Sequence, residues 1–201
     1  MTEKWWDVTS VLYHWFRQLF PFRQILDQEN KKLESMLIPA QPAGKRVVDI
    51  GIGVGNVVPY LDSSLTIVGI DVSPAMLNRV RGSFPHVHLA QADASFLPLK
   101  SSSVELVTAI GVIEYVQHVE VFFRDVATAL RENGFLAVTF SPKGLFARGR
   151  LVLGHVIYPR SLGEIMTIAA ANHLEVISHS ASLMQVQALF RKNENNNQPS
   201  V

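Results

Sequence analysis

Three glycines and three aspartates are the residues whose types and spacing suggest chemistry in this chain of 201 residues. The glycines alternate in VVDIGIGVGN (residues 47–56), a stretch typical of a buried strand followed by a tight loop. Because glycine lacks a Cβ atom, such a loop can turn sharply and bring its backbone close to a ligand. A strand–helix turn that binds nothing would use the same residues, so the loop alone leaves both interpretations open.

Each aspartate lies at the end of an expected strand. Asp49 precedes the glycine loop, where its charge suits a ligand with a cationic amine better than one with two phosphates. Asp71 ends LTIVGID, 20 residues after Gly51, where a carboxylate can accept hydrogen bonds from ribose hydroxyls or cap the next helix. Asp93, in QADASFLPL, could accept an adenine amino group or be an ordinary loop residue.

A dinucleotide site is a rival interpretation of the same loop. Its fingerprint is G-x-G-x-x-G, whose third glycine allows close packing of the following helix. Here Gly55 comes one residue early and Asn56 occupies the later position. An NAD(P)-dependent oxidoreductase is therefore disfavoured but stays open, because Asp71 could serve a ribose in that class too.

Alternating β-rich and helical segments predict how these residues are positioned. Seven stretches are strand candidates: RVVDI, LTIVGI, HVHLA, VELVTAI, FLAVTF, LEVISHS and LMQVQALFRK. Strand–helix alternation favours a parallel sheet covered by helices on both faces, and the short connection between the last two strands favours an antiparallel hairpin. We therefore predict an α/β, doubly wound, mostly parallel seven-stranded sheet with an antiparallel C-terminal strand. Ligands of such sheets bind at the carboxyl ends of the strands.

Helices are expected between the strands and before the first one. Those between the strands begin near Asn56, at Pro74 after the capping residue Ser73, near Val119 (ending near Arg131), and after Ser161 (ending in a left-handed turn at Asn172). The predicted organisation is an N-terminal helical lid or appendage (residues 1–44), a Rossmann-like domain (45–192) and a flexible tail (193–201). The aromatic residues of the first region could cover a flat or lipidic substrate, or only dock these helices on the body.

Composition excludes several classes of protein. The formal net charge of +1 gives no case for a nucleic-acid partner, because that affinity depends on many phosphate contacts. Without cysteine there are no disulfides or thiolate metal sites, and we expect no metal. No apolar run reaches the roughly 18 residues of a membrane span, and the first residues do not resemble a secretory signal. We expect a cytoplasmic protein; the sequence does not indicate its oligomeric state.

Taken in order, these segments resemble the class I S-adenosylmethionine-dependent methyltransferases. VVDIGIGVG is similar to that family's first motif, GIDVSPAML to its acidic second motif, and QADASFLPLKSSSVELV to its third and fourth. IGVIEYVQHVEVFFRDVATALRENGFLAVTF resembles the segment from the fourth to the fifth strand. The resemblance spans about residues 45–192. It is nearest to the small-molecule branch that includes the ubiquinone and menaquinone biosynthesis methyltransferases.

The resemblance implies that the cofactor is S-adenosyl-L-methionine, with S-adenosyl-L-homocysteine as product. It also implies a set of cofactor contacts: the methionine portion with Asp49, Gly51, Ile110 and Gly111; close backbone passage at Gly53 and Gly55; the ribose hydroxyls with Asp71; and the adenine with Asp93, Ala94, Val72 and Met76.

The implied reaction is an in-line displacement of the methyl group by an atom of a small, aromatic or lipidic acceptor. Positioning alone can lower such a barrier by roughly 7–11 kcal/mol, and a general base can add about 10²- to 10⁴-fold. Glu114 is the first candidate for that base and Tyr115 the second. Many family members have a histidine pair or Glu-His here, so a non-catalytic cofactor-binding protein stays an alternative. Further candidates for acceptor contact are Tyr13, His14, His118 and Tyr158.

One more variable segment follows the fifth expected strand. SPKGLFARGRLVLGHVIYPR (residues 141–160) is locally basic among apolar residues. It could attract an acidic substrate, make peripheral contact with a membrane surface, or carry only solvated charges.

Overall fold

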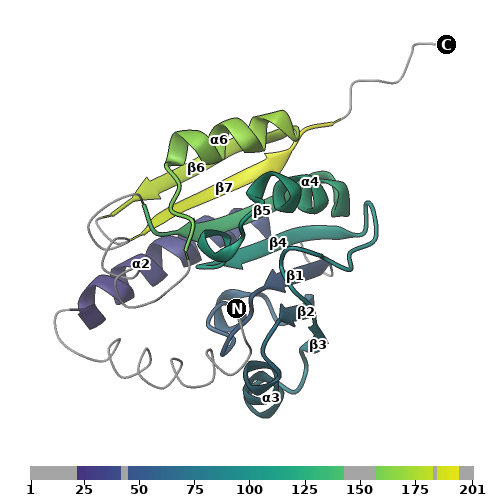
Figure 1. Cartoon of the computed structure of the whole chain (residues 1–201). Coiled ribbons are helices and arrows are strands. Elements are labelled where there is room, and N and C mark those ends of the chain that lie inside the picture. The colour runs from purple at the N-terminus through teal and green to yellow at the C-terminus, as the bar shows by residue number, and fades with distance from the viewer. Residues whose placement is uncertain (1–21, 42–44, 143–156, 183–184, 195–201) are drawn as a thin grey trace.

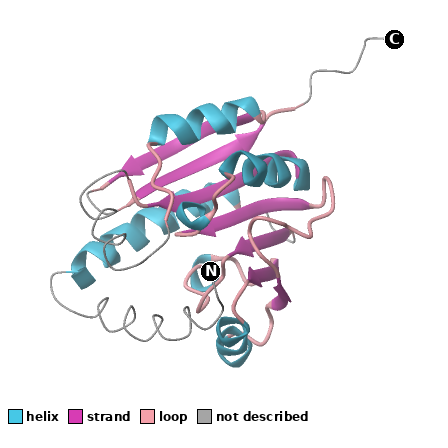
Figure 2. Cartoon of the chain, in the orientation of Figure 1, coloured by secondary structure: helices cyan, strands magenta, loops and turns pink. Residues whose placement is uncertain are grey.

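The computed structural model of the chain describes residues 22–41, 45–142, 157–182 and 185–194. These residues form a seven-stranded sheet with the strand order β3-β2-β1-β4-β5-β7-β6 (Figures 1 and 2). Its strands are β1 (Arg46–Ile50), β2 (Thr66–Asp71), β3 (His88–Gln91), β4 (Val104–Ile110), β5 (Leu130–Phe140), β6 (Leu174–Ala181) and β7 (Val186–Lys192). All neighbouring pairs are parallel except those of β7, which runs antiparallel to β5 and β6. The predicted sheet, with its antiparallel C-terminal strand, is confirmed.

Helices cover both faces of this sheet. Helices α4 (Val119–Ala129) and α6 (Leu162–Ala171) lie on one face, while α2 (Phe22–Leu37) passes behind the sheet and α3 (Pro74–Ser83) packs near β2 and β3 (Figure 1). Three short 3-10 helices are η1 (Ile38–Ala40), η2 (Val58–Tyr60) and η3 (Ile113–Tyr115). The strand order reverses between β1 and β4, so the ligand site of a doubly wound sheet is expected beside their carboxyl ends.

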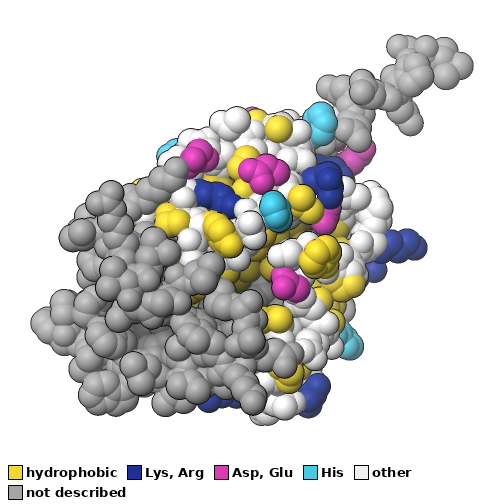
Figure 3. Space-filling model, in the orientation of Figure 1, with side chains coloured by type: hydrophobic (Ala, Val, Ile, Leu, Met, Phe, Trp, Pro, Cys, Tyr) yellow, Lys and Arg dark blue, Asp and Glu magenta, His cyan; other side chains and the backbone are white. Residues whose placement is uncertain are grey.

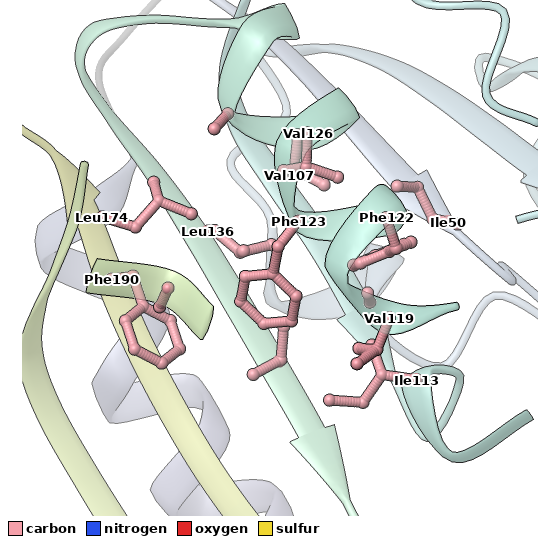
Figure 4. Close-up of a cluster of buried hydrophobic side chains, with 14 of the residues drawn as sticks. Ile50, Val107, Ile113, Val119, Phe122, Phe123, Val126, Leu136, Leu174 and Phe190 are labelled. Carbon is pink, nitrogen blue, oxygen red and sulfur yellow. The ribbon is translucent and has the colours of Figure 1, made fainter. Parts of the chain in front are cut away.

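The larger hydrophobic cluster lies between the sheet and helices α4 and α6. Phe122 and Phe123 of α4 are fully buried, and the ring of Phe123 meets Phe190 of β7 edge to face at a centroid distance of 6.1 Å (Figure 4). Ile165 of α6 joins the same cluster. Burying one such side chain contributes about 1.5–3 kcal/mol, so this cluster fixes β5 and β7 against the helices.

A second cluster lies on the opposite face, under α2 and α3. Leu33 and Leu37 of α2 and Val80 of α3 are buried there against strand residues such as Leu106. Helix α2 therefore belongs to the packed body of the sheet. The division at residue 44 and the role of residues 1–44 as a lid stay predictions.

Helices α3 and α6 begin where the sequence predicts them to begin, each after a capping serine. The Ser73 hydroxyl accepts a hydrogen bond from the Met76 amide (3.3 Å), as expected for the start of α3. At the start of α6, Ser161 and Glu164 form a reciprocal capping box, which satisfies amides that the helix itself leaves unpaired.

One expected helix is absent, and two expected boundaries were wrong. No α-helix follows β1: the described chain forms turns and the single 3-10 turn η2, after which Leu61 is already extended. Helix α4 ends at Ala129 and β5 begins at Leu130, before the expected Gly134. At the end of α6, His173 (φ 59°) takes the left-handed conformation that was expected at Asn172.

The surface of the described residues has mixed charge. Lys and Arg side chains are scattered among acidic and apolar ones over the coloured part of the face in Figure 3. Among the described helices, none combines the length and apolarity that a membrane crossing requires.

Candidate functional site

The glycine loop begins where β1 ends, and all three glycines have positive φ (67°, 55° and 82° for Gly51, Gly53 and Gly55). A Cβ atom on Gly51 would lie 2.2 Å from a methyl of Val112, and one on Gly55 would lie 2.7 Å from the Phe84 ring. A Cβ on Gly53 would meet only a backbone oxygen at 3.9 Å. Packing and conformation therefore require two of the glycines, while Gly53 keeps its outer side open to a ligand.

Asp71 ties this loop to the end of β2. One carboxylate oxygen accepts the Gly53 amide (2.8 Å) and the other accepts the Ser73 amide (2.9 Å). Burial raises the pKa of Asp71, while the hydrogen bonds from Ser73, Gly53 and Val72 act in the opposite direction. The side chain is half-buried, and each carboxylate oxygen has further lone pairs to accept bonds from a ligand.

Asp49 is the residue before the last one of β1, one strand away from Asp71 in the sheet. Its side chain is 1% exposed, and Oδ1 accepts the Thr108 hydroxyl of β4 at 2.7 Å. Oδ2 is buried and accepts no hydrogen bond from any described residue. Burial raises the pKa of Asp49 to about 7, the Thr108 hydrogen bond lowers it, and the charge of Asp71 raises it. A ligand that brings a hydrogen-bond donor or a positive charge to this edge would satisfy Oδ2 and lower the cost of burying the ionised carboxylate.

The expected adenine side lies after β2 and β3. Asp93 is exposed, and its carboxylate accepts the Ser95 amide at 2.8 Å. Val72 is partly exposed, Ala94 packs on the main core, and Met76 is buried. Ala92 N donates to the Asp71 carbonyl (3.1 Å) and Gln91 Nε2 to the Val72 carbonyl (3.1 Å), so the two post-strand segments lie side by side.

At the carboxyl end of β4, Ile110 is half-buried and Gly111 is exposed with φ 70°. The Gly111 amide donates to both the carbonyl and the hydroxyl of Thr139 on β5, each at 3.0 Å. This double contact fixes the turn after β4 beside the glycine loop. The sheet thus brings the expected methionine-side residues to one edge.

Glu114 follows in η3 and is buried, with 4% of its surface exposed. The Ser141 hydroxyl approaches its Oε1 at 3.4 Å. A small pocket at the ends of β4 and β5, too narrow in this structure to hold a water molecule, is lined by Ile113, Glu114, Phe140, Ser141, Tyr158 and Arg160. The structure therefore brings the acid–base candidate together with Tyr158, one of the expected acceptor contacts.

Arg160 holds this pocket together. Its guanidinium donates to the carbonyls of Ile113 (3.3 Å), Gln117 (2.7 Å) and Tyr158 (3.0 Å), while the Tyr158 amide donates to the Glu114 carbonyl at 2.6 Å. Arg160 belonged to the locally basic segment, and here its charge binds carbonyl oxygens of the chain itself.

The other described candidates for acceptor contact, Tyr115 and His118, do not line this pocket. Tyr115 is half-buried in η3, and His118 is exposed at the start of α4 without a side-chain cap. Tyr13 and His14 lie outside the described residues. Among those that are described, no group of three or more His, Asp or Glu side chains could hold a metal ion.

Sequence analysis missed several polar residues of this edge. Thr108, Thr139 and Gln187 occupy alternate positions of buried strands on the face toward α2. Polar residues in otherwise apolar strands were a signal in the sequence, but threonine is common in strands. Which ones face a ligand edge depends on register, and the sequence does not give the register.

The sheet with its reversed seventh strand, its glycine loop and its edge of carboxylates has the fold of the class I methyltransferases. Residues 48–138 match a family model described as a methyltransferase domain, and members of that family bind S-adenosylmethionine. The described sheet thus has the class I methyltransferase fold, and residues 48–138 match a methyltransferase domain; the predicted resemblance and its expected cofactor are supported by these two findings.

Three comparisons give the detail. The ubiquinone/menaquinone biosynthesis C-methyltransferase UbiE of Campylobacter jejuni is 31% identical over 101 residues, which are 46% of this chain and 43% of that protein. The trans-aconitate 2-methyltransferase of Methylobacterium nodulans is 31% identical over 144 residues, 70% of this chain and 54% of that protein. The chain thus spans about half the length of these relatives. The magnesium protoporphyrin IX methyltransferase of Synechocystis, solved with bound S-adenosylhomocysteine, superposes with a TM-score of 0.75 at 16% identity over 95% of this chain and 98% of that one.

Proposed function

We propose that the chain is an S-adenosylmethionine-dependent methyltransferase that methylates a small-molecule acceptor by in-line displacement. The observation that carries the proposal is the edge formed by Asp49, Gly53 and Asp71. There a buried carboxylate oxygen lacks a partner among the described residues, a glycine leaves open space, and a second carboxylate is anchored by two amides. This set fits a ligand with a cationic end and a ribose.

In this proposal each residue has a distinct task. Asp49 attracts the cationic methionine end, helped by the turn at Gly111, and Asp71 accepts the ribose hydroxyls. Asp93 and the apolar Val72 and Ala94 hold the adenine. When bound, the cofactor supplies an electrophilic methyl group on a sulfonium, so the protein's main contribution is to orient the acceptor.

Glu114 is proposed to hold or accept the acceptor's proton. It lies past the end of β4 in the pocket with Ser141 and Tyr158, on the side of the sheet edge away from β2 and β3. Burial gives its carboxylate a fixed position and little competing water, which suits a group that removes a proton during displacement.

The acceptor is proposed to be small and aromatic or lipidic. The relatives named above act on small molecules according to their names, and the described pocket mixes aromatic and polar groups. Peripheral contact with a membrane and a cytoplasmic location stay predictions; the absence of cysteine supports the second.

Titration calorimetry with S-adenosylmethionine and S-adenosylhomocysteine tests the proposal directly. We expect binding of both by the wild-type chain, and a loss of about 10- to 100-fold in affinity for Asp71→Asn, because hydrogen bonds to a charged group are lost. Asp27→Asn, at an exposed position of α2, is the matched control and should bind normally. Failure of both ligands to bind the wild type would refute the proposal, and saturable binding of NADH would favour the oxidoreductase alternative.

A further inference from the structure

A buried carboxylate lies outside the edge described so far, on helix α2. Glu29 is 5% exposed, and its Oε1 accepts the Ser182 hydroxyl at 2.6 Å. None of the ion pairs between described residues includes Glu29. An ionised carboxylate buried without a cationic partner is unfavourable, so this position suits a ligand that brings positive charge.

Gln187 of β7 lies against Glu29 and offers a second acceptor there. Its amide nitrogen donates to the Glu29 carbonyl at 2.9 Å. Its own carbonyl oxygen, Oε1, is buried and accepts no hydrogen bond from the described residues, although the side chain is only 3% exposed. A buried amide oxygen that lacks a donor costs about 1–3 kcal/mol. Two neighbouring residues thus offer acceptors that a multivalent donor could satisfy.

The sheet register places this pair at the ligand edge. Gln187 pairs with Thr139, the residue before the last one of β5, and Thr139 holds the Gly111 amide at the turn after β4. In Figure 1 the start of β7 and the carboxyl ends of β4 and β5 lie at the same edge, and α2 passes behind them. The pair is therefore on the side of the proposed active site.

Glu29 and Gln187 lie to one side of the proposed cofactor site. The methionine end of the cofactor is proposed to lie over β1 and β4, whereas β7 is two strands beyond β4. Strands lie about 4.8 Å apart, so Gln187 is about 10 Å past β4, on the acceptor's side.

We propose that Glu29 and Gln187 bind an ammonium group carried by the methyl acceptor. This rests on the proposed function, and it narrows the acceptor to small molecules with a cationic amine at some distance from the methylated atom. An ammonium has three donors and one charge, which matches the carboxylate and the amide oxygen together. Binding of such an acceptor also stabilises the packing of α2 on the sheet, since it supplies the missing partner.

The test uses the full chain saturated with S-adenosylhomocysteine and two probes of equal size, 2-phenylethylamine and 2-phenylethanol. We expect the protonated amine to bind at least about tenfold more tightly than the alcohol, as for a hydrogen bond to a charged group. Glu29→Gln keeps the size and the acceptor for the Ser182 hydroxyl but removes the charge. It should bring the ratio of the two affinities close to one.

Two further variants make the result specific. Glu34→Gln changes an exposed glutamate on the same helix and should keep the wild-type ratio. Gln187→Met removes the buried amide oxygen, and should lower the amine affinity even if Glu29→Gln does not fold. Equal affinities of the two probes for the wild type, as expected if only a buried water fills the site, overturn the proposal; so does an unchanged ratio in a folded Glu29→Gln protein. If S-adenosylhomocysteine itself does not bind, the proposed function fails instead.

Discussion

Replacing Asp49 by asparagine should abolish a pH-dependent loss of stability. Burial raises the pKa of this carboxyl from 3.8 to about 7 in the folded chain, against the opposing hydrogen bond from Thr108. The folded state therefore keeps its proton to higher pH than the unfolded state, and stability falls as the pH rises from about 4 to about 7. The interval is about three pH units, and at about 1.4 kcal/mol per unit the loss is about 4 kcal/mol.

The assay is urea unfolding of the wild type and of Asp49→Asn at several pH values between about 4.5 and 7.5. Asparagine has the same shape, and its carbonyl oxygen can still accept the Thr108 hydroxyl, so the variant should fold. Its advantage over the wild type in free energy of unfolding should grow with pH by about 3–4 kcal/mol across this range.

A control separates this effect from general titration. Asp27→Asn, on the exposed side of α2, should follow the wild type at every pH. A constant difference between wild type and Asp49→Asn over the whole range would refute the reasoning, because it would mean that Asp49 ionises in the folded chain as it does in the unfolded one. Saturating S-adenosylhomocysteine should reduce the pH dependence, since a cationic ligand stabilises the ionised carboxylate.

Four other predictions concern single residues. Gly51→Ala should lower the free energy of unfolding by about 2 kcal/mol or more, because its Cβ would lie 2.2 Å from a Val112 methyl at positive φ; thermal unfolding that matches the wild type would contradict this. Gly53→Ala, with open space around its Cβ, should cost only about 1 kcal/mol yet weaken binding of S-adenosylhomocysteine in calorimetry, and unchanged affinity would place the ligand elsewhere. Glu114→Gln should lower kcat by about 10²- to 10⁴-fold once an acceptor is found, with cofactor affinity retained; equal turnover would remove its role as base. Phe123→Ala, which empties a fully buried site, should cost about 3–5 kcal/mol in urea unfolding, and a loss below 1 kcal/mol would argue against the described core.

The sheet and its order of elements could be predicted because each strand carried its own local signal. Runs such as VELVTAI and FLAVTF are short and apolar, and glycine or proline separates them from the helices. The close spacing of the last two strands predicted the antiparallel β7. The grouping of Asp49 near the end of β1, Asp71 at the end of β2 and Asp93 after β3 followed from the same logic, since parallel strands bring their carboxyl ends to one edge.

What the sequence did not reveal depends on contacts between distant residues. The Asp49–Thr108 hydrogen bond joins residues 59 positions apart and exists only in one register of β1 and β4. Glu29 looked like an ordinary polar position of a helix, and its burial follows from how α2 lies on β7. The helix expected after β1 is absent because only the 3-10 turn η2 forms there before the chain becomes extended at Leu61.

The position of β7 between β5 and β6 constrains how the molecule assembles. β6 is made first along the chain, yet it reaches the sheet only through β7, which pairs with Phe135–Phe140 on one side and with β6 on the other. Until residues 186–192 are synthesised, β5 keeps an unpaired edge that invites association between growing chains. This side of the sheet therefore cannot form before residues 186–192 are available, and a chain truncated before residue 186 would leave the edge of β5 open to pairing with another strand.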